Sequence, residues 1–165
     1  MVSATLTGMI RTGFESALAA QVVLTSFIPM LMDTGGNSGS QASVTVIRGI
    51  SLGVIEFRDI LRVVWKEFKV SVLCAVTLSI VTFVKILLVD KLLMHAPITA
   101  LVAAVVCATL FVTVVSAKII GCSLPIIAKK LGIDPAVMAS PIITTILDAV
   151  SLLVYFGFAR LLLGI

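Results

Sequence analysis

The stretch PAVMASPIITTILDAVSLLVYFGFA, from Pro135 to Ala159, is apolar enough to cross a membrane and contains a single charged residue, Asp148. A carboxylate near the centre of a bilayer costs about 2.5–3.5 kcal/mol on insertion scales. Such a residue usually has a compensating partner, and that partner is usually part of the function. What compensates Asp148 is therefore the central question that this sequence raises.

The composition of the whole chain indicates an integral membrane protein. Of its 165 residues, 60% are hydrophobic and 12% are charged, whereas a soluble domain is about half apolar and a quarter charged. The apolar segments are long and continuous, which favours helices over barrel strands. We therefore expect an all-α membrane fold in contact with lipid. The net charge of +4 is small and its basic residues lie mainly in loops, so no nucleic-acid partner is expected.

Five transmembrane helices are expected, the first of them incomplete. Residues 2–10 are too short to span a bilayer and are expected to be the back part of a truncated helix. An amphipathic spacing of apolar residues, together with Trp65 and many basic groups, predicts a helix on the membrane surface at 56–68. The remaining spans are expected at 16–50, 69–92, 98–131 and 135–163, the first of these with a Gly-rich break at Thr34–Gln41 that would expose backbone carbonyls to a cavity.

The distribution of basic residues predicts the orientation in the membrane. One side of the expected topology carries seven of them, and the other side carries four, while Lys118 lies within a span. Because cytoplasmic loops are enriched in Lys and Arg, the first side is expected to be cytoplasmic in a multi-pass protein of the plasma membrane, with the N-terminal side inside and the C-terminus outside. The first side comprises Arg48, Arg58, Arg62, Lys66, Lys69, Lys129 and Lys130, and the second Arg11, Lys85, Lys91 and Arg160.

The polar residues of the last span share one face with Asp148. They are Ser140, Thr144, Thr145 and Ser151. Hydroxyls alone could equally be hydrogen-bonding contacts between helices, but the added carboxylate favours a water-filled path for a cation.

The ion that suits this face is a hard divalent cation, which prefers carboxylate, carbonyl and water oxygens. Mg²⁺ keeps its waters tightly, and the two Asp148 residues of a two-fold dimer would neutralise its charge. Lys118 leaves an alternative open, because it could pair with Asp148, pair with Asp33, or extend toward the interface.

Two long motifs resemble a known family. PMLMDTGGNSGSQASVTVIRG (Pro29 to Gly49) resembles the second transmembrane helix of the MgtE family of Mg²⁺ channels, and KKLGIDPAVMASPIITTILDAVSLLVYFGFARLLL (Lys129 to Leu163) resembles that family's last helix and its lead-in. The resemblance covers essentially the whole chain. It implies a homodimer with five helices per subunit and a pore on the dimer axis. Cytoplasmic regulatory domains, which family members usually carry, are not present in this chain.

The same resemblance assigns roles to residues. It implies that Asp148 is the main metal ligand and that Thr144 and Ser140 lie along the ion path. It also implies a pore lining from Gly35, Gly36 and Asn37, to which the polar face of the last helix adds Thr145 and Ser151.

Three hypotheses follow for the function, none of them enzymatic. The first is a channel that passes hydrated Mg²⁺ into the cytoplasm, with Mn²⁺ or other divalent cations as alternative ions. The second is a secondary transporter that couples Asp148 and Lys118 to proton movement. The third is a membrane scaffold in which the polar face only holds helices together.

Overall fold

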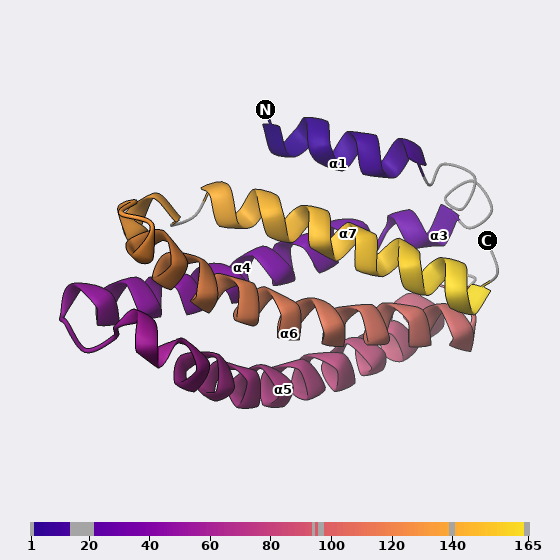
Figure 1. The fold of residues 1–165 in the computed structure, drawn as a ribbon. Helices are drawn as coiled ribbons and strands as arrows, with labels where there is room; N and C mark the ends of the chain where they lie inside the picture. Colours follow the sequence, from indigo (N-terminus) through magenta and orange to yellow (C-terminus); the bar gives the residue numbers. More distant parts are fainter. Residues whose placement is uncertain (1, 14–21, 94, 96–97, 139–140, 164–165) are drawn as a thin grey trace.

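Every regular element in the described part of the protein is a helix (Figure 1). The structure is a computed structural model, and it describes residues 2–13, 22–93, 95, 98–138 and 141–163. The elements are α1 (Val2–Gly13), α3 (Val22–Thr25), α4 (Ile28–Ser51), the 3₁₀ turn η1 (Phe57–Asp59), α5 (Ile60–Lys85), the π-helical η2 (Ile86–Leu93), α6 (Ala100–Lys130), the 3₁₀ turn η3 (Pro135–Met138) and α7 (Pro141–Leu163).

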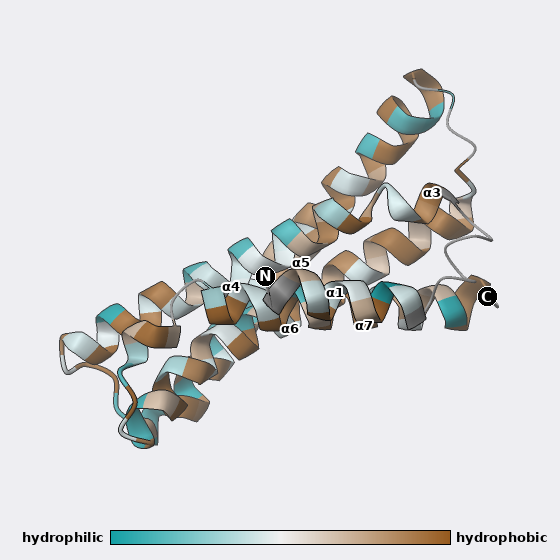
Figure 2. Ribbon diagram, turned by 90° about the horizontal axis from the view of Figure 1, so that it is seen from above, coloured by the Kyte–Doolittle hydropathy of each residue, from teal (hydrophilic) through white to brown (hydrophobic). Residues whose placement is uncertain are grey.

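Three of the described helical stretches are long and apolar enough to cross a membrane. They are Phe57–Leu93, Ala100–Lys130 and Pro135–Leu163, and brown apolar residues predominate along much of the helices in Figure 2. The expected all-α fold is therefore confirmed, with three candidate spans. The 24 residues of α4 are enough for a fourth, but its many glycines and hydroxyl residues make it less apolar.

The longest helix, α6, is the centre of the bundle. It packs against α4, α5 and α7, and it has more buried residues than any other described helix. A helix that is apolar all round is typical of such a central position. Its ends agree with the expected 98–131: Thr99 accepts a hydrogen bond from the N–H of Val102 at 3.3 Å, and Gly132 follows the helix with a φ of 75°.

The Gly-rich stretch Thr34–Gln41 does not break the helix, which corrects the expectation from the sequence. α4 is continuous from Ile28 to Ser51. The irregularity lies earlier, between α3 and α4, where Pro29 occupies the first turn and needs no helical N–H partner.

The glycines of α4 serve close packing against α6 and α7. A Cβ atom at Gly35 would lie 2.6 Å from Oγ of Ser151 and 2.8 Å from Cγ2 of Thr113, distances that real Cβ atoms do not adopt. A Cβ at Gly39 would collide with the side chain of Leu147. Small residues four apart let membrane helices approach closely, and this spacing explains the Gly-rich composition without a break.

The expected surface helix at 56–68 is not a separate element. η1, α5 and η2 follow one another without interruption from Phe57 to Leu93, and this stretch contains neither glycine nor proline. Nothing in the sequence therefore stops the helix at the expected boundary between residues 68 and 69. The amphipathic segment is therefore continuous with the apolar helix that follows it, and its place at the membrane surface stays a prediction.

We expect Gly121→Ala to destabilise the protein by about 2–3 kcal/mol or more, the upper part of the range for overpacking. A Cβ at Gly121 would collide with the backbone of Gly39, which cannot rotate away as a side chain could. Gly157→Ala is the matched control, because a Cβ at Gly157 meets nothing within 4 Å, and alanine there should stabilise helix α7 slightly. Thermal unfolding in detergent measures both. Equal stability of the two variants would contradict the close crossing of α4 and α6.

Candidate functional site

The polar face of α7 lies at the edge of the helix bundle. Thr144, Thr145 and Asp148 are partly exposed in the single chain, whereas Ser151 is buried at 2% exposure. Ser140, which the sequence placed on the same face, lies outside the described residues. The residues of this face that are partly exposed therefore form a short polar strip centred on Asp148.

The hydroxyl groups of this face donate to carbonyls of their own helix. Thr144 and Thr145 donate to the carbonyl oxygen of Pro141 at 3.2 and 2.8 Å, and Ser151 donates to that of Leu147 at 2.6 Å. A hydroxyl that donates in this way keeps acceptor lone pairs on its oxygen. The strip therefore consists of a carboxylate and acceptor oxygens, which is the chemistry that attracts a hydrated cation.

The structure brings the Gly-rich segment of α4 against the same helix. A Cβ at Gly36 would lie 3.5 Å from Cγ2 of Thr144, so the two positions are in van der Waals contact. Gly35 and Gly36 are buried, and the next residue, Asn37, is exposed. The two segments that the sequence singled out separately are therefore neighbours across the contact between α4 and α7.

Ser151 faces α4 in this arrangement. Its hydroxyl oxygen occupies the space that a side chain at Gly35 would need. Within the single chain Ser151 is thus part of the contact between α4 and α7, and Thr144, Thr145 and Asp148 are the more accessible members of the polar face.

No cluster of three or more His, Cys, Asp or Glu side chains that could hold a metal ion occurs among the described residues. A dehydrated divalent cation needs about six oxygen ligands with several negative charges. The described part of one chain therefore holds no such site, and the oxygens that it shows on the face of Asp148 are the hydroxyls of Thr144 and Thr145.

Lys118 pairs with a residue that the sequence did not single out. Its Nζ atom lies 3.3 Å from Oε2 of Glu67 on α5, and the two side chains are only 13% and 14% exposed. In the sequence, Glu67 falls within the predicted surface helix, away from the span that contains Lys118. The sequence signal for this pairing is the four-residue spacing of Glu67, Ser71 and Ala75. This spacing places the carboxylate on the same face of α5 as two small, buried residues.

Comparison with known proteins identifies the family of the chain. Residues 28–158 match the MgtE family, described as divalent cation transporters. The chain is 38% identical over 162 residues to the magnesium transporter MgtE of Thermus thermophilus, covering 96% of this chain and 34% of that protein. It is 36% identical over 158 residues to the magnesium transporter MgtE of Bacillus subtilis, covering 93% and 33% of the two chains.

A third relative is the magnesium transporter MgtE of Enterococcus faecalis, at 30% identity over 157 residues, with 94% of this chain and 33% of that protein covered. The chain thus spans about a third of the length of the curated relatives that it matches. With a family match over most of its length, the chain belongs to the MgtE family of divalent cation transporters.

Proposed function

We propose that this protein conducts hydrated Mg²⁺ across the plasma membrane into the cytoplasm, and that Asp148 is the residue that attracts the ion. The observation that carries this proposal is the partly exposed carboxylate on a membrane-spanning helix, flanked by hydroxyl oxygens and packed beside the Gly-rich segment of α4. The names of the relatives support Mg²⁺ as the ion.

The ion passes with its inner water shell. Mg²⁺ dehydrates reluctantly, and the hydroxyls of Thr144 and Thr145 offer acceptor oxygens to the donor hydrogens of its waters. Asp148 supplies the negative charge, and Ser140, four residues before Thr144 in the sequence, is proposed as a further oxygen along the path. The exposed side chain of Asn37, next to Gly36, adds an amide oxygen from α4.

A two-fold dimer completes the path. One carboxylate leaves a divalent ion half neutralised, whereas a symmetric pair of Asp148 residues balances it. The partial exposure of the polar strip in a single chain supports this arrangement, because a strip on the dimer axis would be covered by its symmetry mate. The pore then lies between the two copies of α7, with α4 beside them. Each subunit contributes five transmembrane helices.

The charges at the helix ends support the direction of transport. The α4–α5 and α6–η3 connections lie at one end of the molecule (Figure 1). Seven basic residues occur in or beside these connections. By the positive-inside rule this end faces the cytoplasm, and the membrane potential then drives a cation inward at about 2.3 kcal/mol per charge per 100 mV.

The pairing of Lys118 with Glu67 weakens the case for a proton-coupled transporter. That alternative depended on Lys118 acting together with Asp148. Glu67 gives Lys118 a carboxylate partner at 3.3 Å. This partner lies on α5, whereas Asp148 lies on α7, and both helices pack against α6. A structural ion pair accounts for this lysine without any coupling to proton movement.

Purified protein in liposomes tests the proposal. We expect Mg²⁺ entry that rises with an inside-negative potential and persists when the pH is equal on both sides. Flux that saturates and requires a pH gradient would instead establish a proton-coupled transporter. If liposomes contain folded protein but show no divalent cation flux, the remaining hypothesis is that of a membrane scaffold.

A further inference from the structure

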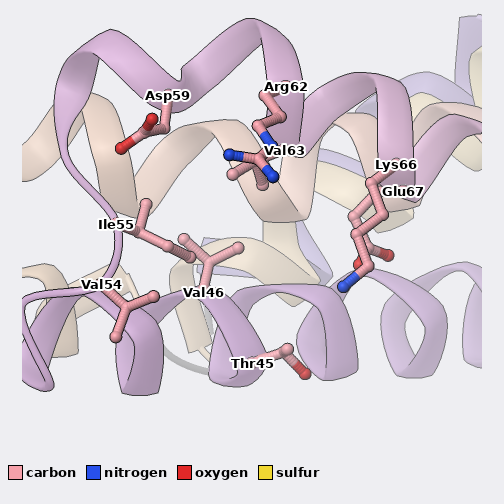
Figure 3. Close-up of a pocket in the computed structure, with 9 residues that line it drawn as sticks. All are labelled: Thr45, Val46, Val54, Ile55, Asp59, Arg62, Val63, Lys66 and Glu67. Atoms are coloured by element: carbon pink, nitrogen blue, oxygen red, sulfur yellow. The ribbon is translucent and has the colours of Figure 1, made fainter.

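A pocket of about 310 Å³ lies between the C-terminal part of α4 and the start of α5 (Figure 3). It is separate from the polar face of α7. Four aliphatic side chains, from α4, from the α4–α5 connection and from α5, form its apolar lining. The apolar residues are Val46, Val54, Ile55 and Val63, and the polar ones are Thr45, Asp59, Arg62, Lys66 and Glu67.

The polar rim of the pocket has an excess of positive charge. Arg62 and Lys66 lie four residues apart on one face of α5, and Figure 3 shows both extending from α5 toward α4. Glu67 is neutralised by Lys118 at 3.3 Å. The two cations therefore outweigh the remaining carboxylate, that of Asp59, which also accepts a hydrogen bond from the N–H of Glu56 at 3.0 Å.

The side chains beside the pocket are typical of the boundary between hydrocarbon and water. Trp65, next to Lys66 in the helix, is 60% exposed, and Leu61 is 80% exposed. Nζ of Lys69 lies 5.9 Å from the centre of the Trp65 ring. Tryptophan with neighbouring lysine marks the boundary between hydrocarbon and water in membrane proteins, and exposed leucine indicates contact with acyl chains. A ligand in this pocket would thus meet both environments.

We propose that this pocket binds an anionic phospholipid. The lipid phosphate lies between Arg62 and Lys66, where a guanidinium can donate two parallel hydrogen bonds and an ammonium adds a point charge. The first part of an acyl chain lies against Val46, Val54 and Val63, which removes apolar surface from water. The proposal does not depend on which ion the protein carries.

Lipid retention tests the proposal directly. Native mass spectrometry of the detergent-solubilised protein counts bound phosphatidylglycerol, and titration with a fluorescent phosphatidylglycerol gives an affinity. We expect Arg62→Gln/Lys66→Gln to weaken that affinity about tenfold or more. The matched control is Arg58→Gln/Lys69→Gln, which removes one arginine and one lysine from the same end of the molecule but outside the pocket, and should retain the lipid.

A second variant tests the apolar half of the pocket without changing its charge. Val54 is 74% exposed at the pocket mouth, so Val54→Trp fills the space from outside and should also displace the lipid. Equal loss in the pocket and control double variants would overturn the proposal, because only bulk charge would then matter. Equal binding of phosphatidylcholine would also overturn it.

Competition experiments with soluble phosphates show whether the bound phosphate belongs to a lipid. Glycerophosphate and inorganic phosphate are expected to compete poorly, because they lack the acyl chain. Competition by either as strong as that of the lipid would establish a soluble phosphate site in place of a lipid site. Displacement of phosphatidylglycerol by an acidic peptide, but not by a second phospholipid, would assign the pocket to a protein segment.

Discussion

Asp148→Ala is expected to reduce Mg²⁺ flux in liposomes more than about a hundredfold while the protein stays folded. Unit charges 4 Å apart interact by about 4 kcal/mol at an effective dielectric constant of 20. A divalent ion between two carboxylates has several attractions of this size, and the variant removes them. Asp148 is partly exposed rather than part of the closely packed core, so its truncation should leave no large cavity. Flux of Mg²⁺ by fluorescent indicator, with thermal unfolding of the same sample, measures both effects.

The control for this variant removes the same charge elsewhere. Asp134 lies in the loop before α7, where its Oδ1 atom accepts a hydrogen bond from the N–H of Ala136 at 2.9 Å. Asp134→Asn keeps an acceptor oxygen there and should leave flux nearly unchanged. Asp148→Asn should weaken the binding of divalent cations in titrations. Normal flux through folded Asp148→Ala protein would refute the role of this carboxylate.

Lys118→Met should destabilise the protein by about 3–5 kcal/mol, because it leaves the carboxylate of Glu67 buried without its partner. The double variant Lys118→Met/Glu67→Met should recover most of this loss, since two apolar side chains of similar volume then fill the contact between α5 and α6. Denaturation in mixed micelles, followed for the single and double variants, gives the coupling free energy between the two positions.

An exposed ion pair provides the comparison for this cycle. Arg58 and Glu56 lie 3.0 Å apart, but their side chains are 81% and 57% exposed. Arg58→Gln should therefore change stability by less than about 1 kcal/mol. If the effects of Lys118→Met and Glu67→Met were additive in the double variant, the ion pair would have no energetic role in the bundle.

The sequence predicted the features that depend on local pattern. The apolar runs located α6 and α7 because a membrane span needs a minimum length of apolar residues. Gly132 correctly marked the end of α6, since a glycine with positive φ is the usual residue after a helix. The polar face around Asp148 followed from helical periodicity alone.

The features that depend on neighbouring helices could not be predicted in this way. Gly35 and Gly39 indicated a break because glycine weakens an isolated helix, and only the proximity of Ser151 and Leu147 reveals their packing role. The pairing of Lys118 with Glu67 joins residues far apart in the sequence. It depends on how α5 and α6 are rotated relative to each other, which no local pattern encodes.

The contact between Gly39 and Gly121 has a consequence for motion. Where two helix backbones touch, neither helix can turn about its own axis or slide by one turn without first separating from the other. α4 and α6 are therefore bound to tilt together as one rigid body, and α5 follows through its ion pair with Lys118. If the proposed ion path lies beside α7, we expect its opening to move α4, α5 and α6 together relative to α7.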